Sequence, residues 1–413
     1  MDEPTQPLMP YTPQPRRPRR RSRRVGELTA VSLLSAALAT GGTWGAISLA
    51  SDDSPGSGST GTGTAATASG SGTADAQPVS SAAKQSPDWN AVTSTVAPSV
   101  VAIGVRGEST GGEGSGVVLD DEGHVVTNNH VVSGAGDNAK ITVTLDGGAT
   151  YAATVEGTDP STDLAVITIT DPPNDLHPIS VGSSAGLTVG DPVMAVGNPL
   201  GLAGTVTTGI VSALDRPVAT SAQEEQQQQG SPFAQRQESQ SSPVVTSAIQ
   251  TSAAVNPGNS GGALVDASGR LVGINSSIAS VGSSGGQSGS IGIGFAIPAD
   301  EVTWIAEQLI ENGTAEHAFL GVTPQDGQAT EGAATHSGAE ITSVSEGSPA
   351  ASAGLETGDL VTGIDDSPVA SAESLVGLIH ARRIDSSVAL TVIRDGQERT
   401  IDVTLGTAPS SDA

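Results

Sequence analysis

Three residues along the chain have the types that catalysis by a serine nucleophile requires. His130 follows an apolar run, Asp163 opens another, and Ser260 stands in the segment Gly-Asn-Ser-Gly-Gly at 258–262. A serine hydroxyl is a poor nucleophile unless a neighbouring base takes its proton, and an imidazole that titrates near neutrality suits that role. The imidazole needs a buried carboxylate, which fixes its tautomer and stabilises its charged form.

The glycines beside Ser260 allow the backbone to turn sharply, so that the N–H groups of Gly258 and Ser260 can point at a developing oxyanion. One such donor contributes ~3 kcal/mol in well-studied proteases. The order His, Asp, Ser along the chain is that of the chymotrypsin-like double barrel. Alone, the serine segment could be a flexible loop and Asp163 could cap a turn; the three segments together are far more specific.

The elements that must position these residues are predominantly strands. The chain has 413 residues, enough for two compact domains, with 53 Gly but only three Trp, two Tyr and three Phe. From residue 92 onward, short apolar runs alternate with turn signals, which predicts an all-β barrel or sandwich. A helix is predicted from Asp300, as its cap, to Asn312, with a stop at Gly313. Residues 216–243 are rich in Gln, Ser and Pro and are predicted to be a mobile insertion rather than a strand.

The N-terminal segments indicate export. Residues 1–27 form a cytoplasmic Arg- and Pro-rich tail, and residues 28–50 carry no charge and can form a transmembrane helix. A cleaved signal peptide ending at Ala50 is the alternative, although a run of this length favours an anchor. Residues 51–87 are a disordered Ser, Gly and Thr linker, residues 88–313 form the first domain, and residues 318–407 form a second, α+β domain with a helix over 370–381.

Composition narrows the function classes. The chain has no Cys, which excludes disulfides, thiol catalysis and thiolate metal sites. Its net charge is −27, and an acidic body repels phosphate backbones, which argues against nucleic-acid partners. No metal or cofactor is expected.

The segment between about 95 and 312 resembles the HtrA (DegP/DegS-like) serine proteases, and the last 90 residues resemble a single PDZ domain. The matching stretches of the first domain are 114–116, 127–132, 162–166, 197–199, 209–214, 256–264, 273–275 and 292–298. In the second domain Phe319-Leu320-Gly321-Val322 matches the loop that receives a peptide carboxylate. The resemblance implies a chymotrypsin-like double β-barrel followed by a PDZ domain, with C-terminal peptides as ligands of Phe319, Leu320, Gly321 and Val322.

The resemblance also implies roles for the catalytic residues: His130 as base, Asp163 as its orienting partner and Ser260 as nucleophile. The Gly258 and Ser260 amides would form the oxyanion hole, with Asn259 between them. The implied function is extracytoplasmic cleavage of unfolded exported proteins by a homo-oligomer, usually a trimer joined near Trp89. A membrane-tethered PDZ chaperone with vestigial proteolysis is the alternative.

Three departures from related proteases bear on regulation and specificity. Asn259 replaces the Asp that pairs with a new N-terminus in trypsin-like zymogens, so activation is expected to work through loop ordering instead. Residues 216–243 occupy the place of the family's shorter sensor loop, which leaves the signalling from the PDZ domain open. Residues 251–255 contain no Asp for a basic side chain, so a small apolar residue is expected before the scissile bond.

Overall fold

The structure is a computed structural model that describes residues 86–107, 111–133, 139–199, 204–220, 244–256, 258–277 and 292–408. The predicted tail and transmembrane helix, and nearly all of the predicted linker, lie outside the described residues. Among the residues that are described, no helix has the length and apolar character needed to span a bilayer.

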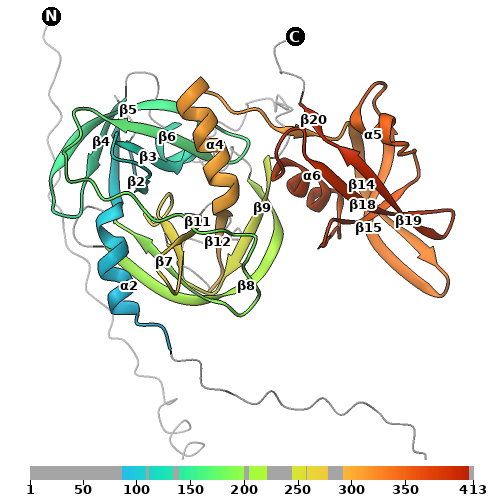
Figure 1. The fold of residues 1–413 in the computed structure, drawn as a ribbon, viewed down its shortest axis with the longest axis horizontal. Coiled ribbons are helices and arrows are strands. Elements are labelled where there is room, and N and C mark those ends of the chain that lie inside the picture. Colours follow the sequence, from blue (N-terminus) through green and yellow to red (C-terminus); the bar gives the residue numbers. More distant parts are fainter. Residues whose placement is uncertain are drawn as a thin grey trace, which may run out of the picture. The chain divides into compact units, whose positions relative to one another are not determined.

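Six antiparallel strands close the first barrel in the order β1-β2-β3-β6-β5-β4 (Figure 1). Exposed and buried side chains alternate where one face is solvated, as in the predominantly β-branched segment Lys-Ile-Thr-Val-Thr of β4. The Asp120–Gly123 turn closes the β2–β3 hairpin, with the Leu119 N–H donating to the His124 carbonyl at 2.9 Å. The strands are β1 (Val100–Arg106), β2 (Gly111–Val118), β3 (His124–Asn128), β4 (Lys140–Thr144), β5 (Thr150–Asp159) and β6 (Leu164–Ile169).

A second closed barrel follows, in the order β10-β11-β12-β9-β8-β7. Strand β8 continues to Thr220 and pairs with β9, so the prediction that the insertion begins at 216 is wrong by five residues. Cross-strand pairing extends the strand beyond the point at which polar composition indicates a loop. The strands are β7 (Pro192–Gly197), β8 (Thr205–Thr220), β9 (Val244–Thr251), β10 (Ala263–Asp266), β11 (Leu271–Ser276) and β12 (Gly294–Pro298).

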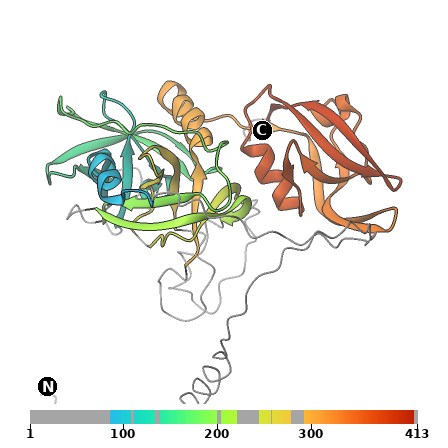
Figure 2. The ribbon, with the colours of Figure 1, turned by 60° about the horizontal axis from the view of Figure 1, so that its bottom comes forward.

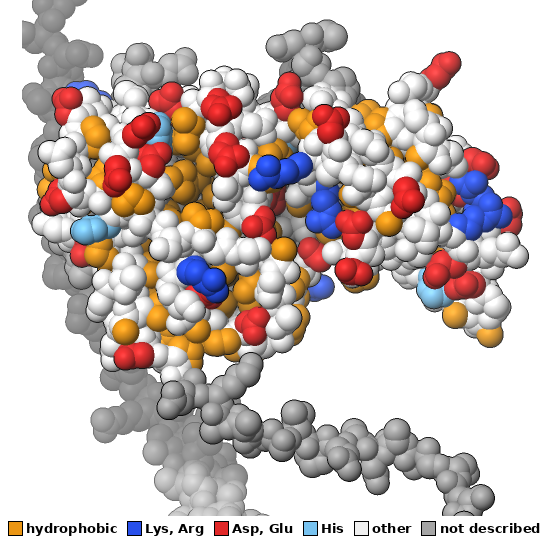
Figure 3. All heavy atoms as spheres, viewed as in Figure 1, with side chains coloured by type: hydrophobic (Ala, Val, Ile, Leu, Met, Phe, Trp, Pro, Cys, Tyr) orange, Lys and Arg blue, Asp and Glu red, His pale blue; other side chains and the backbone are white. Residues whose placement is uncertain are grey.

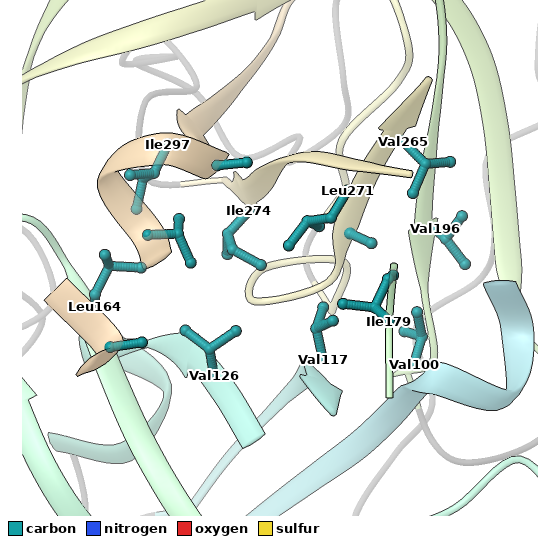
Figure 4. Packing of buried hydrophobic residues seen from close by; sticks show 14 of the residues in the cluster. Val100, Val117, Val126, Leu164, Ile179, Val196, Val265, Leu271, Ile274 and Ile297 are labelled. Carbon is teal, nitrogen blue, oxygen red and sulfur yellow. The ribbon is translucent and has the colours of Figure 1, made fainter. Parts of the chain in front are cut away.

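One hydrophobic core joins the two barrels (Figure 4). Val117, Val126 and Leu164 of the first barrel belong to the same buried cluster as Ile274 and Ile297 of the second, and none is more than 3% exposed. Burying one such side chain contributes about 1.5–3 kcal/mol. This shared core fixes the barrels against each other, so a site assembled from both can be held rigidly.

Helix α4 (Ala299–Asn312) packs across both barrels with its apolar stripe of Val302, Ile305 and Leu309, and ends at Gly313, which has a left-handed φ of 74°. The predicted helix and its stop are thus confirmed. The predicted cap is wrong, because Pro298 is the N-cap and the Asp300 carboxylate instead accepts hydrogen bonds from a neighbouring turn, Ser183 to Ala185.

Three short helical segments complete the first domain: α2 (Trp89–Val96), the 3₁₀ segment η1 (Ala97–Ser99) and α3 (Asn129–Ser133). The Asp88 carboxylate caps α2 by accepting the N–H groups of Asn90 and Ala91, both at 3.2 Å. Trp89 is half-buried against the core of its own domain.

The second domain, drawn in orange to red in Figure 2, has a core of its own and a sheet of order β14-β15-β16-β18-β19. Strand β14 lies at the edge of this sheet, and helix α6 confirms the helix predicted for this region. The elements are β13 (Ala318–Phe319), β14 (Val322–Glu331), β15 (Ala334–Val344), α5 (Pro349–Ala353), β16 (Leu360–Ile364), β17 (Ser367–Pro368), α6 (Ala372–His380), β18 (Ser387–Arg394), β19 (Gln397–Thr404) and β20 (Gly406–Thr407).

The surface reflects the acidic composition. The chain carries 44 Asp and Glu against 17 Lys and Arg, and acidic side chains are scattered over the face drawn in Figure 3. On that face the Lys and Arg side chains form small, separate groups.

Candidate active site and peptide groove

His130 and Asp163 meet at one end of the first barrel. His130 lies in α3, directly after β3, and Asp163 directly precedes β6, the neighbour of β3 in the sheet. The His130 Nδ1 atom lies 3.0 and 2.9 Å from the two carboxylate oxygens of Asp163. A proton on Nδ1 in this pair leaves Nε2 as an acceptor, which is the tautomer that a general base needs.

The conformation of Asp163 is fixed from several directions. Its φ of 59° lies in the left-handed region, which is unfavourable for a residue other than glycine. Its carbonyl accepts the N–H of Asn129 and the side-chain amide of Asn128, both at 3.0 Å, and its carboxylate accepts the N–H of His130 at 3.0 Å. The Ser276 hydroxyl donates a further bond of 3.3 Å to the carboxylate. The side chain is 8% exposed, so the carboxylate is held in place rather than free to rotate.

Ser260 lies in the tight loop before β10 of the second barrel. Gly261 has a φ of 81°, and a Cβ atom there would lie 2.1 Å from the Ser115 carbonyl oxygen. The Ser260 carbonyl accepts the N–H of Ser115 at 2.8 Å, which attaches the loop to strand β2 of the first barrel. Glycine is therefore required beside the serine for a steric reason, and the loop is held by both barrels.

Two backbone N–H groups in the Ser260 loop are available as hydrogen-bond donors. Among the described residues, the Gly258 and Ser260 N–H groups have no acceptor within the protein. The Gly258 carbonyl, by contrast, accepts the Ser115 hydroxyl at 2.6 Å, and that hydroxyl also accepts the Asn198 N–H at 2.8 Å. Gly258 has a φ of 95°, which only glycine adopts readily. Two unused N–H groups in one loop are the kind of donors that an oxyanion hole requires.

Ser260 is not hydrogen-bonded to His130 in this structure. In the described part of the chain its Oγ bonds to the Ser277 hydroxyl and accepts the Ser277 N–H at 3.2 Å. Asn259, between the two candidate oxyanion donors, is 1% exposed. His130 and Asp163 are thus hydrogen-bonded to each other, whereas the Ser260 hydroxyl is bonded to Ser277.

A groove in the second domain is lined by residues 318–322 and by Leu375, Val376 and Ile379 of α6. Gly321 has a φ of 83°, and a Cβ atom there would lie 2.2 Å from the Ser348 side chain. The groove runs between α6 and the edge strand β14, and an edge strand offers backbone hydrogen bonds to an added strand. The four residues predicted from the sequence, 319–322, therefore lie together at one groove.

Comparison with known proteins decides the family. Residues 114–274 match the trypsin-like peptidase domain, and residues 318–405 match the PDZ domain. The serine protease PepD of Mycobacterium tuberculosis is 44% identical over 81% of this chain and 70% of its own length. The chain belongs to the HtrA family of serine proteases. Two further HtrA relatives are a DegP-like periplasmic serine endoprotease of Chlamydia pneumoniae, 40% identical over 72% of this chain and 56% of its own length, and the solved HtrA-type protease AlgW with a tripeptide. The AlgW match has 32% identity and a TM-score of 0.53, and covers 79% of this chain and 99% of AlgW.

Membership of the HtrA family confirms the predicted fold class, a chymotrypsin-like double barrel followed by a PDZ domain. The structure also adds residues to which the sequence assigned no role: Ser115, Ser276, Ser277 and Asp159. Ser115 lies within the matching stretch 114–116, and Ser276 and Ser277 follow the matching stretch 273–275, but serine is so frequent in this chain that its presence alone signals nothing. Asp159 lies four residues before Asp163, at the end of β5 and beside a turn that reads as an ordinary connection.

Proposed function

We propose that this chain is an extracytoplasmic endopeptidase in which Ser260 attacks the peptide carbonyl, His130 accepts and later donates the proton, and Asp163 orients His130. The observation that supports this most strongly is the pairing of His130 with the buried Asp163 carboxylate, at 2.9–3.0 Å, in the barrel adjoining the serine loop. The free N–H groups of Gly258 and Ser260 would stabilise the tetrahedral oxyanion.

The substrates we propose are unfolded exported proteins. An unfolded chain exposes both extended apolar segments and a free C-terminus, and the second domain has a groove beside an edge strand that suits a C-terminal peptide. The carboxylate would bind the N–H groups of the loop Phe319, Leu320, Gly321 and Val322. Ala253 and Val255, before the nucleophile, are buried and apolar, which supports a small apolar residue on the acyl side of the cleaved bond.

Location and assembly belong to the same proposal. A tether by residues 28–50 would place the body outside the membrane, as the Arg residues of the tail favour a cytoplasmic N-terminus. A homo-oligomer, a trimer with contacts near Trp89, is the proposed assembly, and sedimentation analysis of the full chain in detergent would test it. A monomer at all concentrations would contradict this part.

The alternative function is peptide binding without proteolysis. The observation that favours it is the bonding of Ser260 to Ser277 in place of His130. A hydroxyl can change rotamer at small cost, whereas the His130–Asp163 pair and the oxyanion loop are fixed by packing, so we prefer the protease.

Ser260→Ala tests the two functions against each other. It is expected to abolish cleavage of a chemically unfolded protein and to leave the affinity for a C-terminal peptide unchanged, since the groove lies in another domain. Ser268→Ala is the matched control, because Ser268 is an exposed turn residue, and it should cleave like the parent protein. Cleavage that survives in Ser260→Ala, after purification to remove contaminating proteases, would contradict the proposal.

A further inference from the structure

The turn that presents Asp163 has a second buried carboxylate at its other end. Asp159 is the last residue of β5 and is 4% exposed. Its partner in the ladder is Leu164, the first residue of β6, so residues 160–163 form the whole connection between the two strands. The turn includes the left-handed Asp163, and such a conformation persists only where surrounding contacts determine it.

The Asp159 side chain spans this turn from the inside. One carboxylate oxygen accepts the Ser161 N–H at 3.0 Å, and the other accepts the Thr162 hydroxyl at 2.5 Å. Thr162 is fully buried, so its hydroxyl cannot exchange this partner for solvent. Two bonds from one carboxylate to the residues directly before Asp163 restrict the backbone that determines where the Asp163 side chain points.

A third partner holds Asp159 from outside the turn. His317, in the segment after α4, places its Nε2 atom 3.0 Å from the same oxygen that accepts Ser161. The His317 ring packs edge-on against Trp304 of α4, with centroids 6.2 Å apart. A carboxylate that is bonded to a backbone N–H, a buried hydroxyl and a packed imidazole has little freedom to reorient.

The remaining titratable groups near this carboxylate are Glu301 of α4 and His380, whose ring centroid is 6.0 Å from that of His317. Burial, and then the charge of Asp159, raises the pKa of the Glu301 carboxyl to about 8. Burial lowers the pKa of His380. A proton on Glu301 removes a negative charge from the surroundings of Asp159, whose carboxylate accepts three hydrogen bonds.

From these contacts we infer that Asp159 is a positioning residue of the proteolytic reaction: it fixes the turn that presents Asp163 to His130, and His317 fixes Asp159. The inference rests on the proposed function. Among the described residues Asp159 bonds to Ser161, Thr162 and His317 and not to His130, so it acts through the orientation of the imidazole. A misplacement of about 1 Å in a catalytic group can lower a rate about 100-fold.

Asp159→Ala, Asp159→Asn and the control Asp120→Ala test this. Asp120 is also bonded to backbone N–H groups and an imidazole within a turn, that between β2 and β3, but its side chain is 38% exposed: its carboxylate accepts the N–H groups of Glu122 and His124, at 3.0 and 3.1 Å, and lies 2.6 Å from the His124 ring. Asp159→Ala is expected to lower kcat about 10–100-fold and to change KM by no more than about twofold. Asp159→Asn should have a kcat between those of Asp159→Ala and the parent protein. Asp120→Ala should leave both kcat and KM unchanged.

The low-field ¹H NMR signal of the His130 Nδ1–H gives a readout that does not depend on activity. It is expected in the parent protein and in Asp120→Ala, and shifted or absent in Asp159→Ala. If Asp159→Ala does not fold, Thr162→Val replaces it, since it removes only the hydroxyl donor to Asp159. A parent protein without activity contradicts the proposed function but leaves this signal as the test of Asp159. Unchanged kcat and an unchanged signal in a folded Asp159→Ala or Thr162→Val protein would overturn the inference.

Discussion

The two halves of the candidate active site differ in whether their side chains already form the hydrogen bonds that a catalytic triad requires. The first barrel supplies His130 and Asp163, which are bonded to each other and held by the backbone of α3 and by Ser276. The second barrel supplies Ser260, whose hydroxyl bonds to Ser277. In the proposed mechanism His130 is therefore preorganised as the base, and completing the triad requires a change at the serine side. That mechanism places the control of activity at Ser260 rather than at His130.

Ser115 connects the halves, and its removal should have a larger effect than the removal of Ser276 or Ser277. Its hydroxyl, on strand β2 of the first barrel, donates to the Gly258 carbonyl and accepts the Asn198 N–H, both in the second barrel. Ser115→Ala is expected to release the loop that aims the Gly258 N–H and to lower kcat about 10–100-fold, since loss of an oxyanion donor outright costs about 100–1,000-fold. Steady-state kinetics on a peptide substrate would measure this. A parent-like kcat in a folded variant would show that the loop holds its shape without Ser115.

The adjacent residues Ser276 and Ser277 should respond in opposite directions. Ser276 supports the base half by its bond to Asp163, whereas Ser277 withdraws the Ser260 hydroxyl from His130. Ser277→Ala is expected to raise the basal rate about 3–10-fold, because one side-chain hydrogen bond has a net value of about 0.5–1.5 kcal/mol. Ser276→Ala should lower the rate by a similar factor. If the cleavage rates of both variants change in the same direction, the contrast between the two halves of the site is wrong.

Glu301, behind the base half, predicts a dependence of stability on pH. Its pKa is 4.5 as a free group and about 8 when folded, so between these values the folded protein holds a proton that the unfolded chain releases. Stability should consequently fall as pH rises from about 4.5 to about 8, by up to about 1.4 kcal/mol per pH unit. Glu301→Gln, which stays neutral, should lose less stability over this range. Urea unfolding at pH 5 and pH 8 would measure the difference, and parallel losses in the two proteins would contradict it.

Features that depend only on neighbouring residues could be predicted from local patterns in the sequence. The glycines around Ser260 are needed for backbone conformation and close approach at that very place, and Gly313 ends α4 for the same kind of reason. The strands could likewise be predicted, because a strand that is buried on one or both faces appears in the sequence as a short apolar run between two turns. These features depend on short-range geometry, which the order of residues specifies directly.

Contacts between distant segments could not be predicted in this way. Ser115 meets Gly258 across 143 positions, and Asp159 meets His317 across 158, so only the packing of the domain brings these pairs together. Asp300 fits a cap by residue type, but the turn at Ser183 to Ala185 competes successfully for its carboxylate. The roles of His130, Asp163 and Ser260 themselves stay predictions, which the geometry supports.

The most direct measurement is the rate at which a fluorophosphonate probe labels Ser260, located by mass spectrometry, in the parent protein and in His130→Ala, each with and without a C-terminal peptide. We predict labelling at Ser260 alone in the parent protein and a rate lower by about 10⁴-fold or more in His130→Ala, since a hydroxyl without its base is barely nucleophilic. No labelling of Ser260 under any of these conditions, or equal rates in the two proteins, would contradict the account.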